Sequence, residues 1–436
     1  MQKNSKTNSF SDFIFYLFGH KALVQEITLR DEVDETSFQQ AVKKTAEIHT
    51  WIKSVPYEKD GEVFFKITDD PFEAIHHDGP LSFEEDKIKN RLFQITWFKN
   101  KIWISLFHIL TDGVGLLMFY KTLMYYYFSI KNQKDYKAND IYTGMTEDLF
   151  NEPFVRKLAI ADSFEMPLFD KGENAFHFFE LGGKFDFMGS GVGDSDEVMF
   201  HNNFTVSSHA FMAYCKKNGM TPTVAFEVFM AKALQSLYPE NKAPFLASIP
   251  VNFRKLAGCP NSHKNSFVSV NQKINPGMLY QDDQTLGKKL RADFNSITNE
   301  NTIKTLVNKT IDILSEASNY HSIQEKIKFY RERAEITYES YILTYIGVLS
   351  KTGYSDEILD SMWFVYAPIP IISMVDTGGS FSITANSTFD FTKYFTALQA
   401  QFEAHGIPVL SKKNLGSTKL MDTDFFANSK RFAGKA

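Results

Sequence analysis

The chain carries the sequence Phe107-His108-Ile109-Leu110-Thr111-Asp112-Gly113 between two segments of different character. Before it, two runs rich in β-branched and aromatic residues, 92–98 and 102–107, predict a hairpin. After it, residues 114–129 are apolar around the whole helical circumference, which is typical of a buried helix. We therefore expect His108 at the edge of a sheet, where an imidazole can face a cleft. Imidazole is the side chain whose proton affinity suits base catalysis near neutral pH.

Two further residues of this motif have expected roles. Asp112 follows the bend and is predicted to hold the local backbone rather than to touch a substrate. Gly113 is predicted to let the chain turn without a clash of a Cβ atom. The competing interpretation is a core histidine after a hairpin, with Asp-Gly as an ordinary turn.

The pattern on both sides of the motif predicts an α+β fold. Upstream, residues 22–30 and 63–67 are strand-like, and Asp34 fits the N-cap of a helix. Downstream, Thr221-Pro222 is a strong helix start, because proline suits the first helical position. Further predicted elements are a strand at 198–204, a helix from Ser207 or Ser208, a strand at 245–251, helices within 284–351, strands at 362–367, 370–375 and 380–388, and a helix at 391–405.

The length of 436 residues predicts two domains, because a single hydrophobic core stops growing at about 250–300 residues. Residues 182–196 hold five glycines and resemble an exposed crossover. The expected organisation is an N-terminal half at 1–181 that carries the motif, a linker at 182–196, and a C-terminal half at 197–436.

Composition excludes several classes of function. The net charge of −5 gives no basic field to hold a nucleic acid, so no nucleic-acid partner is expected. The two cysteines, Cys215 and Cys259, form neither a disulfide framework nor a metal quartet, so we expect no metal site and a reducing environment. No run of about 18 apolar residues exists and no signal peptide is apparent, which predicts a cytoplasmic protein without a transmembrane segment.

The motif and its flanks together resemble a known superfamily. The elements His49-Thr50-Trp51-Ile52, His108-x-x-x-Asp112-Gly113 and Ile249-Pro250-Val251-Asn252-Phe253-Arg254 occur in this order. This order resembles the chloramphenicol acetyltransferase-like superfamily, whose members include condensation domains and alcohol acetyltransferases. The alcohol acetyltransferase branch is the most similar in length and in its free-standing chain.

The resemblance implies a fold and a reaction. Two chloramphenicol acetyltransferase-like α/β domains would share a channel at their interface. No cofactor would be bound permanently, and an acyl-CoA such as acetyl-CoA would be the co-substrate. His108 matches the general base of an acyltransferase, acting on an alcohol-type hydroxyl or an amine. Asp112 matches the structural aspartate, and Arg254 its partner, which we expect as a bidentate pair.

The group that stabilises the oxyanion is less defined. Condensation domains usually carry a second histidine where this chain has Phe107, which disfavours peptide-bond condensation. Asn265 matches the region of a structural asparagine and is a candidate oxyanion or tunnel residue. Ser382, Thr384 and Asn386 alternate along a predicted strand and are further candidates, with a solvent-facing polar stripe as the alternative.

Aromatic residues make up 15% of the chain, and one cluster suggests a feature of the acceptor. We expect Phe176, Phe178 and Phe179 to narrow an apolar channel, which favours a small hydrophobic acceptor. Two other functions remain open: a catalytically inactive binding or scaffold protein, and a condensation-type enzyme supplied by an acyl carrier protein. His263 is expected in a solvated loop, with contact to a coenzyme A phosphate as the alternative.

Overall fold

The computed structural model describes residues 4–6, 22–59, 62–81, 83, 86–136, 141–167, 174–176, 178, 198–320, 323–333, 339–349, 353–365 and 370–419. The predicted linker at 182–196 lies outside this part of the chain. The helices are α2 (Glu35–Ile48), α3 (Gly113–Lys131), α4 (Ser208–Lys217), α5 (Pro222–Leu237), α6 (Asp283–Ile297), α7 (Glu300–Ala317), α8 (Ile323–Arg333) and α9 (Thr392–Ala404). The strands are β1 (Asn4–Lys6), β2 (Ala22–Leu29), β3 (Ser54–Lys59), β4 (Glu62–Ile67), β5 (Ile75–His76), β6 (Phe93–Phe98), β7 (Lys101–Phe107), β8 (Val198–Ser207), β9 (Phe245–Asn252), β10 (Phe267–Ile274), β11 (Tyr341–Val348), β12 (Ile358–Val365), β13 (Ile371–Asp376), β14 (Ser380–Ser387) and β15 (Val409–Lys419).

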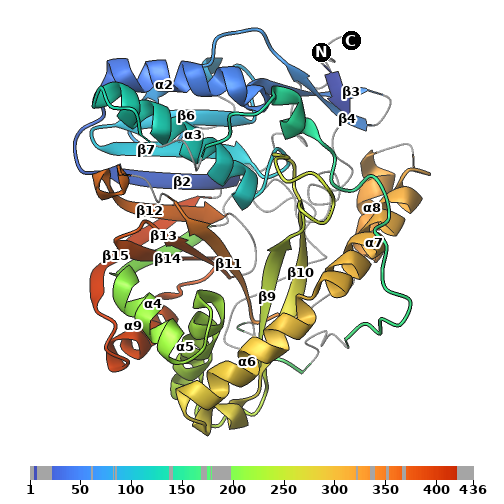
Figure 1. Ribbon diagram of the computed structural model, residues 1–436, viewed down its shortest axis with the longest axis vertical. Coiled ribbons are helices and arrows are strands. Elements are labelled where there is room, and N and C mark those ends of the chain that lie inside the picture. Colours follow the sequence, from blue (N-terminus) through green and yellow to red (C-terminus); the bar gives the residue numbers. More distant parts are fainter. Residues whose placement is uncertain are drawn as a thin grey trace.

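The first sheet has five strands in the order β12-β2-β7-β6-β5, and α2 and α3 cover one of its faces (Figure 1). Helix α2 begins where the Asp34 side chain accepts a hydrogen bond from the Ser37 N–H at 2.8 Å, which satisfies one of the donors left open at a helix start. Its buried side chains Phe38, Ala41 and Val42 recur at helical spacing. These side chains belong to the main hydrophobic core, which is continuous across both halves.

The second sheet has seven strands in the order β10-β9-β11-β13-β14-β8-β15. Its centre is parallel, because β11 pairs in parallel with both β9 and β13. Helices α4, α5 and α9 lie together against this sheet, and α6 and α7 run beside β9 and β10 (Figure 1). Helix α5 starts at Pro222 and is buried over most of its length, so it forms the core of this half. Strands β1, β4 and β3 form a separate small sheet.

Strand β12 joins the two halves. It comes late in the sequence, yet it pairs antiparallel with β2 and forms the edge of the first sheet. A small buried cluster of Val24, Trp103, Met362 and Phe364 from the first sheet includes Met199 of β8. The two halves are therefore joined through β12, which belongs to the C-terminal half in sequence and to the first sheet in structure.

Most predicted elements are confirmed, and the differences have physical causes. The strand at 22–30, the cap at Asp34, the hairpin, the buried helix and the helix starts at Ser207 and Pro222 all agree with the structure. The helices expected within 284–351 are confirmed as α6, α7 and α8, but the end of this range is wrong, because Tyr341–Val348 forms strand β11. Strands β1, β3, β5, β10 and β15 were not predicted. Strand β15 is a polar edge strand, whose residues give no apolar alternation to read.

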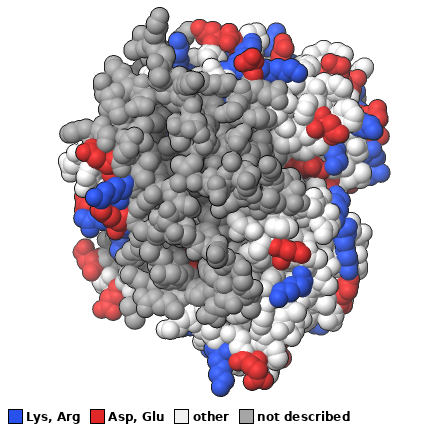
Figure 2. Space-filling view, turned by 180° about the vertical axis from the view of Figure 1, so that it is seen from behind, with Lys and Arg blue, Asp and Glu red and all other residues white. Residues whose placement is uncertain are grey.

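The surface carries charges of both signs. On the face shown in Figure 2, the Lys and Arg side chains of the described residues are interspersed with Asp and Glu. This distribution agrees with the small net charge of −5. Among the described residues, no helix combines the length and apolar character needed to span a bilayer.

Candidate active site

The motif loop joins β7 to α3. Strand β7 ends at Phe107, whose N–H donates to the Leu92 carbonyl at 3.0 Å, and a turn closes where the Leu110 N–H donates to the Phe107 carbonyl at 3.0 Å. His108 is the first residue of this turn and is half-buried. Its ring centroid lies 6.1 Å from that of Phe267, the first residue of β10. The imidazole therefore lies where the second sheet approaches the first.

Asp112 caps helix α3 and is almost fully buried. Its Oδ1 accepts hydrogen bonds from the N–H groups of Val114 at 3.1 Å and Gly115 at 3.0 Å. Its Oδ2 accepts a third from the Ser266 N–H at 2.9 Å. A carboxylate at this position also interacts favourably with the positive end of the helix dipole. The carboxylate thus holds both the start of α3 and a segment of the C-terminal half.

Arg254 contacts Asp112 from the second half of the chain. Its Nη2 lies 2.7 Å from Asp112 Oδ1, and this is the single hydrogen bond between them. The expected bidentate pair is therefore wrong. The other donors are occupied: Nη2 also donates to the Lys264 carbonyl at 2.7 Å, Nε to the Ser262 carbonyl at 2.7 Å, and Nη1 to Asn252 Oδ1 at 3.1 Å. With four contacts made, the buried guanidinium is well compensated for its loss of water.

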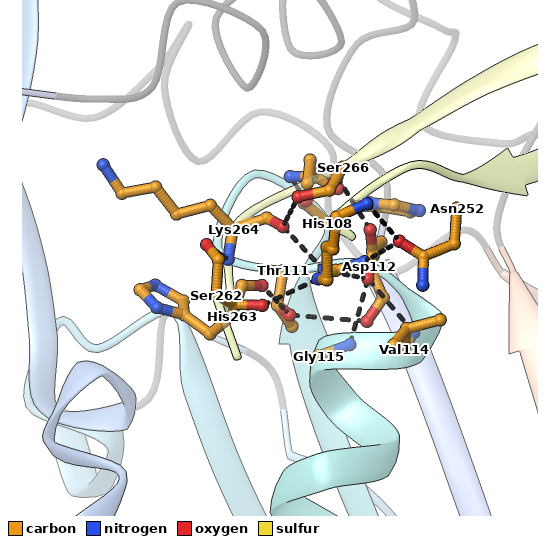
Figure 3. Close-up of polar contacts among 12 residues, drawn as sticks. His108, Thr111, Asp112, Val114, Gly115, Asn252, Ser262, His263, Lys264 and Ser266 are labelled. Atoms are coloured by element: carbon orange, nitrogen blue, oxygen red, sulfur yellow. Dashed lines mark hydrogen bonds and ion pairs between the residues drawn. The ribbon is translucent and has the colours of Figure 1, made fainter. Parts of the chain in front are cut away.

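The segment Ser262–Ser266 clamps the motif loop from the other side (Figure 3). The Asn265 side chain donates from Nδ2 to the His108 carbonyl at 2.8 Å, and a longer contact of 3.4 Å reaches the Ile109 carbonyl. The Thr111 hydroxyl donates to the His263 carbonyl at 2.5 Å. Asn265 is therefore placed on the backbone of His108, a position that fits loop support rather than direct contact with a reacting oxygen.

His263 is buried, so the expectation of a solvated loop is wrong. Its ring stacks on Trp51 with centroids 4.9 Å apart and planes 6° from parallel. Its Nδ1 and its backbone N–H both bond the Leu149 carbonyl. Burial lowers the pKa of His263 well below its ordinary value. The nearby His49 is buried too, and burial lowers its pKa to about 3. Both imidazoles are uncharged at neutral pH.

Two glycines begin helix α3, and the second is the more constrained. A Cβ atom on Gly115 would lie 2.0 Å from Thr111 Oγ1 and 2.4 Å from the His263 carbonyl oxygen. A Cβ on Gly113 would lie 3.0 Å from Ile346 Cδ1, the end of a flexible side chain. Gly113 is the first helical residue and does not have a positive φ, so its expected role in turning the chain is wrong. Sequence reasoning missed Gly115, although the spacing Gly-x-Gly after Asp112 marks a close approach of backbone.

The polar stripe on β14 is buried rather than solvent-facing. Ser382 and Thr384 are each 1% exposed and Asn386 is fully buried. The Asn203 side chain donates to Ser382 Oγ at 2.9 Å and to Thr384 Oγ1 at 3.1 Å, which leaves each hydroxyl with its own proton to donate. Asn386 Oδ1 lies 2.8 Å from His201 Nδ1. Within the described residues, no hydrogen bond joins this stripe to the motif loop.

The aromatic cluster at 176–179 lies away from the motif. Phe176 and Phe178 are buried among aromatic side chains of the second half, and Phe176 packs on Phe245 at the start of β9 with centroids 5.5 Å apart. Arg254 follows the other end of β9, about 23 Å away along the strand at the usual rise per residue. The prediction that Phe176 and Phe178 narrow a channel beside His108 is therefore wrong. Phe179 lies outside the described residues.

The described part of the chain holds no metal-ligand cluster and no activated thiol. Those residues contain no set of three His, Cys, Asp or Glu side chains arranged to hold a metal ion. Cys215 and Cys259 are buried free thiols, and burial raises the pKa of Cys215 to about 12 and that of Cys259 above its ordinary value. Neither thiol is activated as a nucleophile.

Comparison with known proteins gives solved structures only. No protein-family model and no curated protein matches the chain. Polyketide synthase associated protein 5 from Mycobacterium tuberculosis superposes with a TM-score of 0.62 at 14% identity over 91% of this chain and 96% of its own. TRI101 of F. graminearum with ethyl coenzyme A gives 0.59 at 11% over 94% and 99%. TRI3 trichothecene 15-O-acetyltransferase from Fusarium sporotrichioides gives 0.60 at 10% over 92% and 95%. With these similarities along nearly its whole length, the chain has the two-domain fold of the chloramphenicol acetyltransferase-like acyltransferases.

Proposed function

We propose that this protein transfers an acyl group from an acyl-CoA thioester to a hydroxyl or amine group of a small molecule, with His108 as the general base. One observation carries the proposal. The half-buried His108 stands on a turn whose backbone is held by Asn265, while the adjoining Asp112 is held by Arg254. A base must be positioned to within a fraction of an ångström to remove a proton during attack, and a loop of the first half that is held by two residues of the second half meets that requirement.

The proposed reaction needs no covalent intermediate on the protein. The imidazole of His108 removes the proton from the acceptor as its oxygen or nitrogen attacks the thioester carbonyl carbon. The C–S bond of the tetrahedral intermediate then breaks, and the imidazolium returns the proton to the departing thiolate of coenzyme A. Asp112 and Arg254 touch neither substrate in this scheme, because their polar atoms bond to each other and to the backbone.

The charge that develops on the thioester oxygen needs a hydrogen-bond donor. Ser382 and Thr384 remain candidates, since each hydroxyl accepts from Asn203 and keeps a proton to donate. Their role is a less developed part of the proposal than that of His108, because the contacts that support it lie within β14 and β8 only. Asn265 is the weaker candidate, because its Nδ2 is already engaged by the His108 carbonyl.

The solved relatives support coenzyme A as the carrier of the acyl group. TRI101 of F. graminearum has been solved with ethyl coenzyme A, and with coenzyme A and deoxynivalenol together. We extend the donor class to this chain and leave the acceptor at the level of a small molecule with a hydroxyl or amine group. The hydrophobic acceptor predicted from 176–179 has lost its structural basis.

Thiol release from acetyl-CoA in the presence of a panel of alcohols and amines tests the proposal. We expect His108→Ala to abolish acyl transfer while circular dichroism and thermal unfolding stay unchanged. His77→Ala is the matched control, because His77 is exposed and its imidazole hydrogen-bonds only the Gly79 carbonyl, at 2.9 Å, within the described chain. Unchanged turnover in the His108→Ala protein would overturn the role of His108. Binding of coenzyme A without thiol release for any acceptor would favour a binding protein instead, and turnover only with acyl carrier protein would favour a condensation-type enzyme.

A further inference from the structure

A pocket of about 270 Å³ lies on the outer part of the first sheet, between the segment that leads into β5 and the segment that leads into β6. None of its lining residues belongs to the motif loop, to the Arg254 segment or to the β14 stripe. The described residues around it fall into two groups. An apolar part includes Phe72, Ile75, Ile88, Phe93 and Ile95, and a charged part consists of Lys87, Lys89, Arg91 and Glu73.

Arg91 is the most deeply placed of the charged groups, at 5% exposure. Its Nη2 donates to the Pro71 carbonyl at 3.0 Å and weakly to the Asp70 carbonyl at 3.4 Å, and the guanidinium lies 5.2 Å from the Phe72 ring centroid. Its Nε is buried and has no hydrogen-bond partner within the described chain. A buried N–H without a partner is costly and rare, so Arg91 keeps one unused donor beside the pocket.

Three cations meet in this pocket within five residues of sequence. Lys89 and Asn90 both adopt the left-handed region, with φ of 55° and 59°, and this turn separates Lys87 from Arg91 on the way into β6. Neither lysine nor Arg91 forms an ion pair with any described residue. Glu73 is the one described carboxylate in the lining, so the lining residues carry a formal charge of +2, and the nearby Asp70 attracts Arg91 from outside the lining.

We propose that this pocket binds an organic phosphate monoester that carries a short apolar or aromatic group, at a site separate from that of His108. The phosphate would lie against Lys87, Lys89 and the Nε side of Arg91, and a dianion matches the net charge of the lining better than a monocarboxylate. The apolar group would lie on Phe72, Phe93 and Ile95, which supply a hydrophobic wall. A volume of about 270 Å³ limits the ligand to a small molecule.

Isothermal titration calorimetry of the full chain with phenyl phosphate tests this site. We expect saturable binding that weakens at least tenfold in the double variant Lys87→Ala and Lys89→Ala. The matched control is Lys216→Ala with Lys217→Ala, which removes the same charge from exposed positions on α4. Arg91→Lys keeps the charge but loses Nε, and we expect it to weaken binding also, with its thermal unfolding measured alongside.

Three results would overturn the proposal. Equal affinity in the Lys87/Lys89 variant and the control variant would show that the lysines are not part of a site. Benzoate binding as tightly as phenyl phosphate would contradict the choice of a phosphate. Loss of phenyl phosphate binding at saturating coenzyme A would assign the pocket to the donor site of the proposed function. Failure of the His108→Ala test above leaves this proposal intact, because none of these measurements depends on turnover.

Discussion

Arg254 donates from Nη2 to Asp112 Oδ1 at 2.7 Å across 142 residues of sequence, and the two side chains are 1% and 7% exposed. The pair joins the start of α3 in the first half to the segment after β9 in the second. Because Asp112 also caps α3 and accepts from the Ser266 N–H, one carboxylate bonds two pieces of backbone and the Arg254 side chain around the turn that carries His108.

Asp112→Asn should destabilise the fold as well as impair any activity. The amide keeps a cap for α3 but removes the charge, so the buried Arg254 loses its counter-ion, a change that typically costs about 3–5 kcal/mol. Urea unfolding of the variant measures this loss. Arg254→Lys should cost a similar amount, because an ammonium cannot supply the four contacts of the guanidinium. Loss of activity with unchanged unfolding in Asp112→Asn would contradict the structural role.

Gly115→Ala should be far more destabilising than Gly113→Ala. At Gly115 the new Cβ would overlap Thr111 Oγ1 and the His263 carbonyl, and this overlap can be removed only if the segment Ser262–Ser266 moves. We expect a cost of roughly 3 kcal/mol or more, in the range of severe overpacking. At Gly113 only the end of Ile346 must shift, and alanine regains up to about 1 kcal/mol of helix propensity. Thermal unfolding of the two variants provides the comparison, and equal melting temperatures would be the contrary result.

The sequence predicts the local part of this site well and its long-range part poorly. The hairpin, the backbone role of Asp112 and the buried α3 follow from patterns within one segment. The contact of Arg254 with Asp112 was predicted from the resemblance to the superfamily. That the contact is a single hydrogen bond could not be predicted, because Ser262, Lys264 and Asn252 also accept from Arg254, and their positions depend on how the segment after β9 folds back. The stacking of His263 on Trp51 cannot be predicted from a local sequence pattern, because the two residues are 212 positions apart and lie in different halves.

The buried, uncharged imidazole of His49 should make the stability of the protein depend on pH. His49 has a folded-state pKa of about 3, below the ordinary value of about 6.5 that it regains on unfolding. Its contribution is therefore fully present above pH 6.5 and is lost as the pH falls toward 3, at up to about 1.4 kcal/mol per pH unit. Unfolding free energies measured from pH 8 to pH 4 should decline less steeply in His49→Gln than in the natural chain. His76→Gln, at an exposed position, should leave the slope unchanged. Identical slopes in all three proteins would contradict the burial of an uncharged His49.

Glu227 should produce the opposite pH trend. This side chain of α5 is fully buried, neither carboxyl oxygen has a partner in the described chain, and burial raises its pKa well above the ordinary value. A raised folded-state pKa means that stability is lost as the pH rises above about 4.3, where the unfolded chain ionises. Glu227→Gln removes this penalty, so it should stabilise the protein by about 1–3 kcal/mol at pH 8 and by less at pH 5. Urea unfolding at both pH values measures the difference, with the exposed Glu240→Gln as control. A variant that is less stable than the natural chain at pH 8 would show that the carboxyl has a favourable partner.

Asn265→Asp should separate positioning from folding at the proposed base. Asn265 Nδ2 donates to the His108 carbonyl at 2.8 Å, and aspartate would place an oxygen against that carbonyl, which cannot be bridged without a proton. The turn that carries His108 should therefore shift, because the repulsion acts on its backbone directly. We expect kcat for acyl transfer to fall about 10–100-fold, equivalent to roughly 1.4–2.7 kcal/mol, while KM for acetyl-CoA changes little. Asn275→Asp, at an exposed position, is the matched control. Steady-state kinetics on protein shown to be folded by circular dichroism makes the test. A displaced base slows the chemical step even in molecules that are fully folded. A kcat that falls only in proportion to the unfolded fraction would therefore reduce Asn265 to a structural role.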